Sequence, residues 1–293
     1  MIAARGPLHG GSRRADQLFS WLCLASGLLV LVVLALILFS TGHEAMPAFR
    51  QVGLRFLTSS RWDIPADQFG ALAFIYGTLI VSAIALVIAV PISLGLALFI
   101  TELAPEKLRT PAVYLIDLLA AVPSVVYGLW GILVFAPRMG GRSFMTAGIV
   151  LAIMITPIVT SISKEVFATV PADQKEAAWG LGATRFEMIR GAVFPYSRNG
   201  LVGAVMLGLG RAMGETIAVA LVIGSVPAIR AALFEPGDAM AAVIANQFGE
   251  AGGTHRSALI GLGVVLFIMT VLVNVVARKV TGRADRRLAG GTR

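Results

Sequence analysis

Two charged side chains that could act on an anion, Arg211 and Glu215, lie near the middle of the apolar segment 200–224. An arginine guanidinium binds tetrahedral oxyanions through its planar fork of N–H donors. Each charge costs about 2.5–3.5 kcal/mol at the centre of a bilayer, and such residues commonly mark substrate paths. Four residues apart on one helix, the two side chains share a face. We interpret Arg211 as lining an anion path, with Glu215 holding it in place and weakening tight anion binding. The alternative is a buried pair that only fixes the helix register.

Glycines surround this charged pair. Gly210 and Gly214 are four residues apart and form a small-x-x-x-small step, which lets another helix approach closely in a membrane. The step predicts helix packing at these two glycines, and it suits an interface between subunits.

The polar stretch 164–199 contains a helix-start pattern. Asp173 precedes Glu176 by three residues, which is the spacing of a capping box with Asp in the first position. Gly180 and Gly182 can adopt the left-handed conformation that ends a helix. The sequence therefore predicts a short helix that begins at Asp173 and ends at the glycine pair.

A second capping box follows directly, formed by Thr184 and Glu187. It predicts another short helix, which stops before Pro195. The two predicted helices carry four large apolar side chains: Trp179, Leu181, Phe186 and Ile189. These side chains either bury against neighbouring apolar segments or form a docking surface for a soluble partner, and both interpretations stay open at this point.

The composition places these motifs in a membrane protein. Of 293 residues, 57% are hydrophobic and only 14% are charged, whereas about a quarter of a soluble domain is charged. A soluble enzyme, a disordered chain and a coiled coil are therefore disfavoured. Six segments are apolar and long enough, or nearly so, to cross a bilayer as helices: 18–39, 74–100, 113–135, 144–162, 200–224 and 257–277. The sequence predicts an all-α, polytopic integral membrane protein with six transmembrane helices, and prolines at 91, 123 and 157 predict a kink in three of them.

The Lys and Arg residues are distributed unevenly among the loops. With the N-terminus in the cytoplasm, 16 of the 24 fall on the cytoplasmic side and seven fall outside, while Arg211 lies within a span. Positively charged loops favour the cytoplasmic side, so both termini are predicted to be cytoplasmic. Membrane orientation then explains the net charge of +8, and no nucleic-acid partner is expected.

The run EAAWGLGATRFEMIRGAVFP resembles the EAA loop of ABC-importer permeases. The residues that match are Glu176, Ala177, Ala178, Gly182, Ala183 and Pro195. The resemblance implies a MetI-like ABC importer permease fold in which 172–195 is the coupling loop. Its first short helix would insert into a cleft of the ATP-binding subunit, with Glu176 and Gly182 carrying that role.

Three further runs resemble phosphate permeases: GLGRAMGET around Arg211, and the segments 69–102 and 118–137. They are most similar to the C-type permease subunits of Pst phosphate importers. The resemblance implies that Arg211 and Glu215 lie in the phosphate path. It also implies a bacterial cytoplasmic membrane and three partners, namely a second permease subunit of the same family, a dimer of ATP-binding subunits and an extracytoplasmic phosphate-binding protein.

The sequence has no G-x-x-x-x-G-K-[ST] phosphate loop, so any ATP is expected to be bound and hydrolysed by a partner subunit. Its three histidines and one cysteine are scattered, and no catalytic residues, metal ligands or cofactor of its own are expected. The expected function is therefore that of the permease subunit of an ATP-driven phosphate importer. Alternatives are a permease for another oxyanion, such as sulfate or molybdate, and a secondary ion-coupled carrier, which would not need a docking hairpin.

Three parts of the chain are expected. Residues 1–70 would form an N-terminal tail, the first transmembrane helix and an external loop. Residues 71–280 would form the permease domain with five helices, and 281–293 a basic cytoplasmic tail.

Overall fold

The computed structural model describes residues 13–289, and the chain is mainly helical over that range. The parts of the expected tails at 1–12 and 290–293 lie outside the described residues. In chain order the helices are α1 (Arg13–Val52), α2 (Arg55–Thr58), α3 (Leu72–Leu98), α4 (Glu106–Ala121), α5 (Ser124–Trp130), α6 (Ala136–Arg138), α7 (Phe144–Ala168), α8 (Ala172–Gly180), α9 (Arg185–Met188), α10 (Phe194–Gly214), α11 (Ile217–Ile223), α12 (Met240–Gln247) and α13 (Gly253–Ala289). Three π turns, η1 (Phe99–Leu103), η2 (Gly131–Phe135) and η3 (Ile189–Val193), and an antiparallel pair of short strands, β1 (Trp62–Asp63) and β2 (Gln68–Phe69), complete the elements.

The structure confirms an all-α membrane architecture. Four helices of the described chain are long and apolar enough to cross a membrane: Ala15–Val52, Leu72–Leu103, Phe144–Ala168 and Gly253–Ala277. Two bent pairs raise the number to six if each pair is one span: Glu106–Ala121 with Ser124–Arg138, and Arg185–Gly214 with Ile217–Ile223. The six predicted segments fall on these six elements.

The three prolines have unequal effects. Pro91 lies inside the continuous helix α3 and Pro157 inside α7. At Pro123, in contrast, the chain bends by 87° between α4 and the helix that follows, so the predicted interruption of the segment 113–135 is confirmed and is a full break of the helix. Pro123 precedes α5 as its extended N-cap residue. There the missing N–H of proline costs no helical hydrogen bond.

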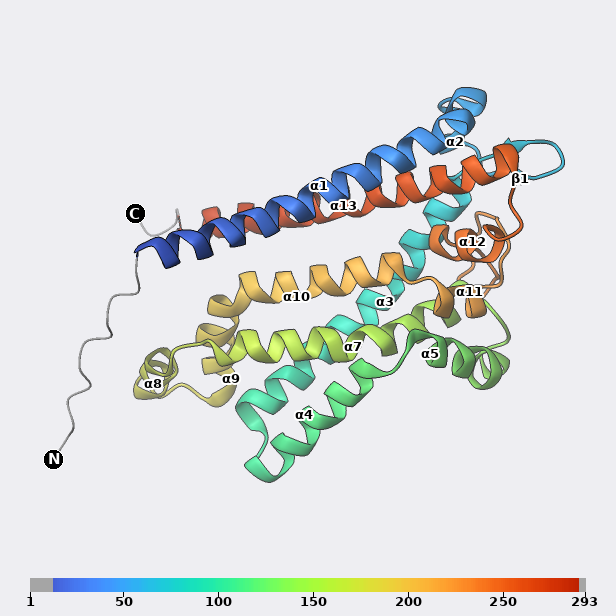
Figure 1. Cartoon of the computed structure of the whole chain (residues 1–293). Helices are drawn as coiled ribbons and strands as arrows, with labels where there is room; N and C mark the ends of the chain where they lie inside the picture. The colour runs from blue at the N-terminus through green and yellow to red at the C-terminus, as the bar shows by residue number, and fades with distance from the viewer. Residues whose placement is uncertain (1–12, 290–293) are drawn as a thin grey trace.

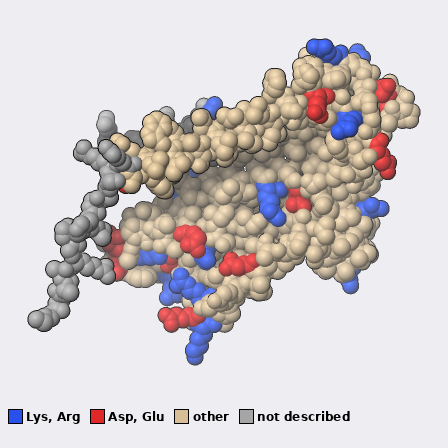
Figure 2. All heavy atoms as spheres, viewed as in Figure 1, with Lys and Arg blue, Asp and Glu red and all other residues tan. Residues whose placement is uncertain are grey.

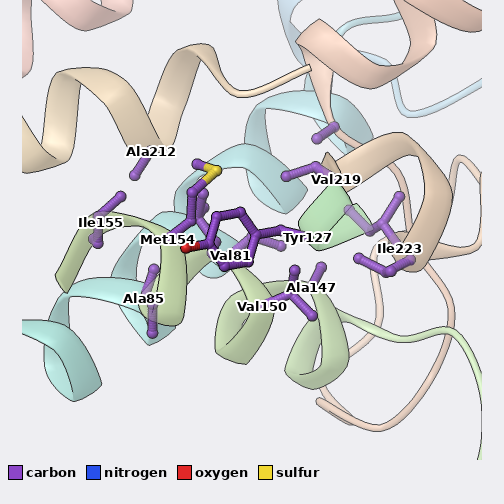
Figure 3. Packing of buried hydrophobic residues seen from close by; sticks show 14 of the residues in the cluster. Val81, Ala85, Tyr127, Ala147, Val150, Met154, Ile155, Ala212, Val219 and Ile223 are labelled. Carbon is purple, nitrogen blue, oxygen red and sulfur yellow. The ribbon is translucent and has the colours of Figure 1, made fainter. Parts of the chain in front are cut away.

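The core lies where α3 and α7 pack against each other and against the broken spans. Figure 3 shows side chains from these elements converging, among them Ala85, Tyr127, Met154, Ala212 and Val219. Small residues allow this packing, because a Cβ on Gly148 of α7 would lie only 2.4 Å from the Ile84 side chain of α3.

Helices α1 and α13 run antiparallel beside each other along one side of the molecule (Figure 1). With 40 residues, α1 extends to Val52, well past the predicted segment 18–39. Its length of about 60 Å is twice the thickness of a bilayer core, so the helix is longer than one crossing needs. Figure 2 shows a broad uncharged surface along the helices, with the charged side chains gathered mainly toward the two ends. The beginning of α1, the end of α13 and α8 lie at the same end of the bundle (Figure 1).

Candidate functional site

The first short helix of the polar loop is α8. It begins at Ala172 with Pro171 as its N-cap, so the prediction that Asp173 caps it is wrong. Asp173 lies in the first turn, where its carboxylate accepts a hydrogen bond from the backbone N–H of Gln174 at 3.0 Å. Pro171 is extended, with ψ 140°, and no side chain caps the first turn, so α8 begins before Asp173 without the predicted capping bond.

The end of α8 explains the glycine of the loop. Gly182 has φ +79°, which confirms the predicted left-handed residue. Its N–H donates to Trp179 O at 2.9 Å, and the N–H of Ala183 donates to Ala178 O at 3.1 Å. These two bonds form a Schellman motif, in which only a residue with positive φ closes the helix. Gly180 lies within α8 and does not serve this purpose.

The second predicted capping box is confirmed at the start of α9. Thr184 Oγ1 accepts from Glu187 N, and Glu187 Oε2 accepts from Thr184 N at 2.8 Å. The predicted stop before Pro195 is wrong, because α9 continues through η3 into α10 and forms one helix, Arg185–Gly214. Gly191, four residues before the proline, lies in η3, where the wider π turn leaves room for the proline ring.

Helix α8 has an inner and an outer face. On the inner face, Ala178 packs against a buried cluster that includes Phe167 and Met188. On the outer face, Glu176 and Ala177 are exposed. Three of the four large apolar side chains of the hairpin are also exposed: Trp179 by 50%, Leu181 by 90% and Phe186 by 69%. Only Ile189 joins the buried cluster, so the hairpin presents an apolar surface at its tip.

The span that carries Arg211 is broken. Helix α10 ends at Gly214, Glu215 is extended with ψ 127°, and α11 begins at Ile217 after a bend of 62°. Thr216 Oγ1 donates to Gly214 O at 3.1 Å across the break. A glycine-rich helix end resists this bend least, because glycine has a low helix propensity.

The break separates the two predicted path residues. Arg211 is exposed on α10, whereas Glu215 is half-buried and lines a cavity of about 10 Å³ together with Thr78 and Ser82 of α3. In the described part of the chain the two side chains form no ion pair with each other. The prediction that they share one helix face and pair is therefore wrong, because the helix ends before Glu215. Ser82 Oγ is buried and has no hydrogen-bond partner among the described residues.

No other helix of the described chain packs closely against the two predicted packing glycines. A Cβ on Gly210 or Gly214 would meet no atom within 4 Å. Close helix approach instead occurs at Gly200 and Gly208, where a Cβ would lie 2.6 Å from a valine side chain of α7. Contact of Gly210 and Gly214 with another subunit stays a prediction.

The broken span of α4 and α5 meets the broken span of α10 and α11. A Cβ on Gly128 of α5 would lie 2.9 Å from the Cα of Ala218 in α11. The hydroxyl of Tyr127 reaches back over the bend and donates to Leu119 O of α4 at 2.9 Å. The sequence motif Pro123 to Gly128 therefore builds a fixed corner between the two broken spans.

One buried carboxyl escaped the sequence analysis. Asp238, between α11 and α12, is 3% exposed, and Ala239 N donates to its Oδ1 at 2.8 Å. Burial raises its pKa from 3.8 to about 7, and the bond from Ala239 offsets this only in part. Within the described range, no three His, Cys, Asp or Glu side chains are grouped so as to hold a metal ion.

Interrupted membrane spans beside a charged residue, with an exposed hairpin at one end of the bundle, are features found in polytopic membrane transport proteins. The chain belongs to the family of inner membrane components of binding-protein-dependent transport systems, whose model matches residues 89–290.

Two relatives match nearly the whole chain. The phosphate transport system permease protein PstC of Mesorhizobium japonicum is 43% identical over 93% of this chain and 91% of its own length. The protein of the same name from Haemophilus influenzae is 43% identical over 90% of this chain and 92% of its own.

Two solved structures share the fold. The methionine ABC transporter MetNI in an inward-facing conformation matches with a TM-score of 0.61 at 17% identity, over 76% of this chain and 99% of that chain. A bacterial alginate ABC transporter in complex with a pentasaccharide-bound periplasmic protein matches with a TM-score of 0.61 at 18% identity, over 92% of this chain and 99% of that chain. The expected MetI-like ABC permease fold is confirmed.

Proposed function

We propose that this chain is the transmembrane permease subunit of an ATP-driven importer that moves inorganic phosphate across a bacterial cytoplasmic membrane. The observation that carries the proposal is the 43% identity to PstC proteins over nine-tenths of both chains. The sequence lacks a nucleotide-binding loop, so a dimer of ATP-binding subunits would bind and hydrolyse the ATP. A second permease of the same family and an extracytoplasmic phosphate-binding protein would complete the importer.

The outer face of α8 is proposed as the contact with the ATP-binding subunit. Its exposed Glu176 and Ala177, and the apolar tip formed by Trp179, Leu181 and Phe186, support a protein interface. Ala178, Gly182 and Ala183 act in this proposal by closing the helix, so that the contact surface keeps its shape. Pro195 lies behind the hairpin, inside the span that the hairpin leads into.

Arg211 is proposed as a phosphate-contacting residue of the path. Its guanidinium is exposed one turn before the break in its span, and broken backbone within a membrane is tolerated where it is buried in protein or lines a water-filled cavity. Glu215 lies at the break itself and faces α3. In the described chain its carboxylate does not pair with Arg211, and we propose that its repulsion of the anion favours release. Gly210 and Gly214 on this helix would admit the second permease.

The ends of the bundle support an orientation of the chain in the membrane. The beginning of α1, the end of α13 and α8 lie together (Figure 1), and Lys and Arg are concentrated in the corresponding segments. We infer that all three are cytoplasmic. A protease added outside intact cells should not remove a tag placed at the C-terminus, and removal of that tag would contradict this orientation.

Uptake of radiolabelled phosphate tests the function. Cells that lack this chain would receive the wild type, Arg211→Gln, or the control Arg61→Gln, which changes an exposed arginine outside the membrane spans. We expect the wild type and the control to restore uptake that excess sulfate does not inhibit, and Arg211→Gln to restore none although the complex still assembles. Sulfate-sensitive uptake would redirect the proposal to another oxyanion, and near-normal uptake with Arg211→Gln would remove Arg211 from the path.

A further inference from the structure

An ion pair ties α8 to the second membrane span. Lys175 Nζ of α8 lies 2.6 Å from Glu102 Oε1 in η1, the π turn that ends α3. The two residues are 73 positions apart in the sequence. Lys175 and Ala178 are three residues apart and therefore share the inner face of α8, opposite the exposed Glu176.

The pair is largely buried. The Glu102 side chain is 8% exposed and the Lys175 side chain 19% exposed. A second Lys–Glu pair, Lys164 and Glu165, lies 3.1 Å apart, but only its lysine is shielded: the Lys164 side chain is 17% exposed and that of Glu165 72%. A shielded pair at hydrogen-bond distance is directional and is little screened by salt, whereas an exposed pair contributes little. Removal of one partner leaves the other charge buried without compensation.

Other connections join α8 to different spans. The chain itself links α8 to α7 through Pro171 and to α10 through α9 and η3. Ala178 adds apolar contact with the cluster that contains Ala97 of α3, and apolar contact has no preferred direction. In the described part of the chain, Lys175–Glu102 is the only ion pair or side-chain hydrogen bond between α8 and the α3–η1 span.

Glu102 also lies close to the turn that joins the second span to the third. The π turn η1 ends at Leu103, and α4 begins three residues later at Glu106. A displacement of η1 therefore moves the end of the second span and the start of the broken third span together. The pair thus connects α8 to the side of the bundle that the covalent chain around α8 does not reach.

Resting on the proposed contact of α8 with an ATP-binding subunit, we propose that the Lys175–Glu102 ion pair is the link through which movement of α8 reaches the second and third spans. Glu102 is then a positioning residue for the coupling of ATP hydrolysis to transport. It touches neither ATP nor phosphate.

The test measures phosphate transported per ATP hydrolysed by the whole importer in vesicles, together with the melting temperature of the complex and the co-purification of the ATP-binding subunit. The variants are Glu102→Gln, Lys175→Met, the two combined, and the exchange Glu102→Lys with Lys175→Glu. Glu165→Gln serves as the matched control, because it removes an exposed partner of a lysine in the same region.

We expect each single change to lower the transport ratio about tenfold, equivalent to about 1.4 kcal/mol, with the ATP-binding subunit still bound. The combined neutral variant should regain thermal stability, because no buried charge is left unpaired, yet keep the low ratio. The exchanged pair should regain both the thermal stability and the transport ratio, and Glu165→Gln should match the wild type in both.

Two results would overturn the link. One is a normal ratio in both single variants. The other is a ratio that recovers in the combined neutral variant, since that recovery would assign the effect to an unpaired charge alone. Failure of the α8 contact on which the link rests has a separate signature, because then Gly182→Val would leave co-purification of the ATP-binding subunit unchanged.

Discussion

Substitution of Gly182 is the sharpest test of the hairpin. The residue has φ +79°, and a Cβ placed on it would meet no atom within 4 Å. The cost of a side chain is therefore backbone strain alone, about 1–2 kcal/mol for an ordinary L-residue in the left-handed region. Such a cost shifts the ratio of closed to open hairpin by a factor of about 5–30. We expect the strain cost to lie at the upper end of this range for Gly182→Val, because valine is β-branched. For Gly182→Asn we expect a cost near the lower end, because asparagine tolerates this conformation.

The assay compares ATP-binding subunit retained on the purified permease with phosphate uptake per ATP hydrolysed. Gly182→Val should lose most of both, and Gly182→Asn should lose little. Gly180→Ala is the matched control, since Gly180 lies within α8 and its Cβ would also meet no atom within 4 Å. Alanine at this helical position should stabilise α8 by up to about 1 kcal/mol and leave coupling intact.

The relative size of the losses in these variants tests the strain at Gly182. Equal effects of Val and Asn at Gly182 would refute the strain argument, because Asn tolerates positive φ far better than a β-branched residue does. Loss of coupling in Gly180→Ala as large as that in Gly182→Val would instead mean that any added side chain blocks the interface.

Other changes test single contacts. Tyr127→Phe removes the hydrogen bond to Leu119 O and should cost about 1 kcal/mol, visible as a lower melting temperature of the complex; an unchanged value would contradict a supporting role at the bend. Thr184→Ala removes the capping box and should cost about 1 kcal/mol of hairpin stability, measured as faster hydrogen exchange in α9; unaltered exchange would speak against it. Because the pKa of Asp238 is about 7 in the folded state and 3.8 otherwise, the folded state keeps a proton at pH values between these two, whereas the unfolded state has released it. Its contribution to stability is therefore full below 3.8 and declines by at most about 4 kcal/mol up to pH 7. Asp238→Asn should flatten that decline in melting temperature against pH, and an identical pH profile would refute it.

The sequence predicted those features that depend on local chemistry. Membrane spans follow from uninterrupted apolar length, and the Thr184 box and the left-handed Gly182 follow from side chains that bond to the adjacent backbone. The start of α8 was misplaced because Asp173 bonds to its own neighbour Gln174 instead of capping the helix.

The features that escaped depend on distant partners. The sequence around Glu102 contains no signal that predicts its ion pair with Lys175, whose Nζ lies 2.6 Å from Glu102 Oε1. Likewise, the bend at Pro123 could have been a mild kink of the kind that helices with Pro91 or Pro157 absorb. Here α5 packs directly against α11, a helix distant in the sequence.

The two broken spans stabilise each other, and this bears on the position of the path. A bent span frees backbone groups, and in a bilayer each unsatisfied group costs several kcal/mol. Here Tyr127 donates to Leu119 O at one bend and Thr216 donates to Gly214 O at the other, while Gly128 lets α5 rest directly on α11. A chain selected only to anchor itself gains nothing from two such bends. They place interrupted backbone inside an otherwise apolar bundle, and Arg211 lies one turn before the second bend, which supports the proposal that the anion path passes this break.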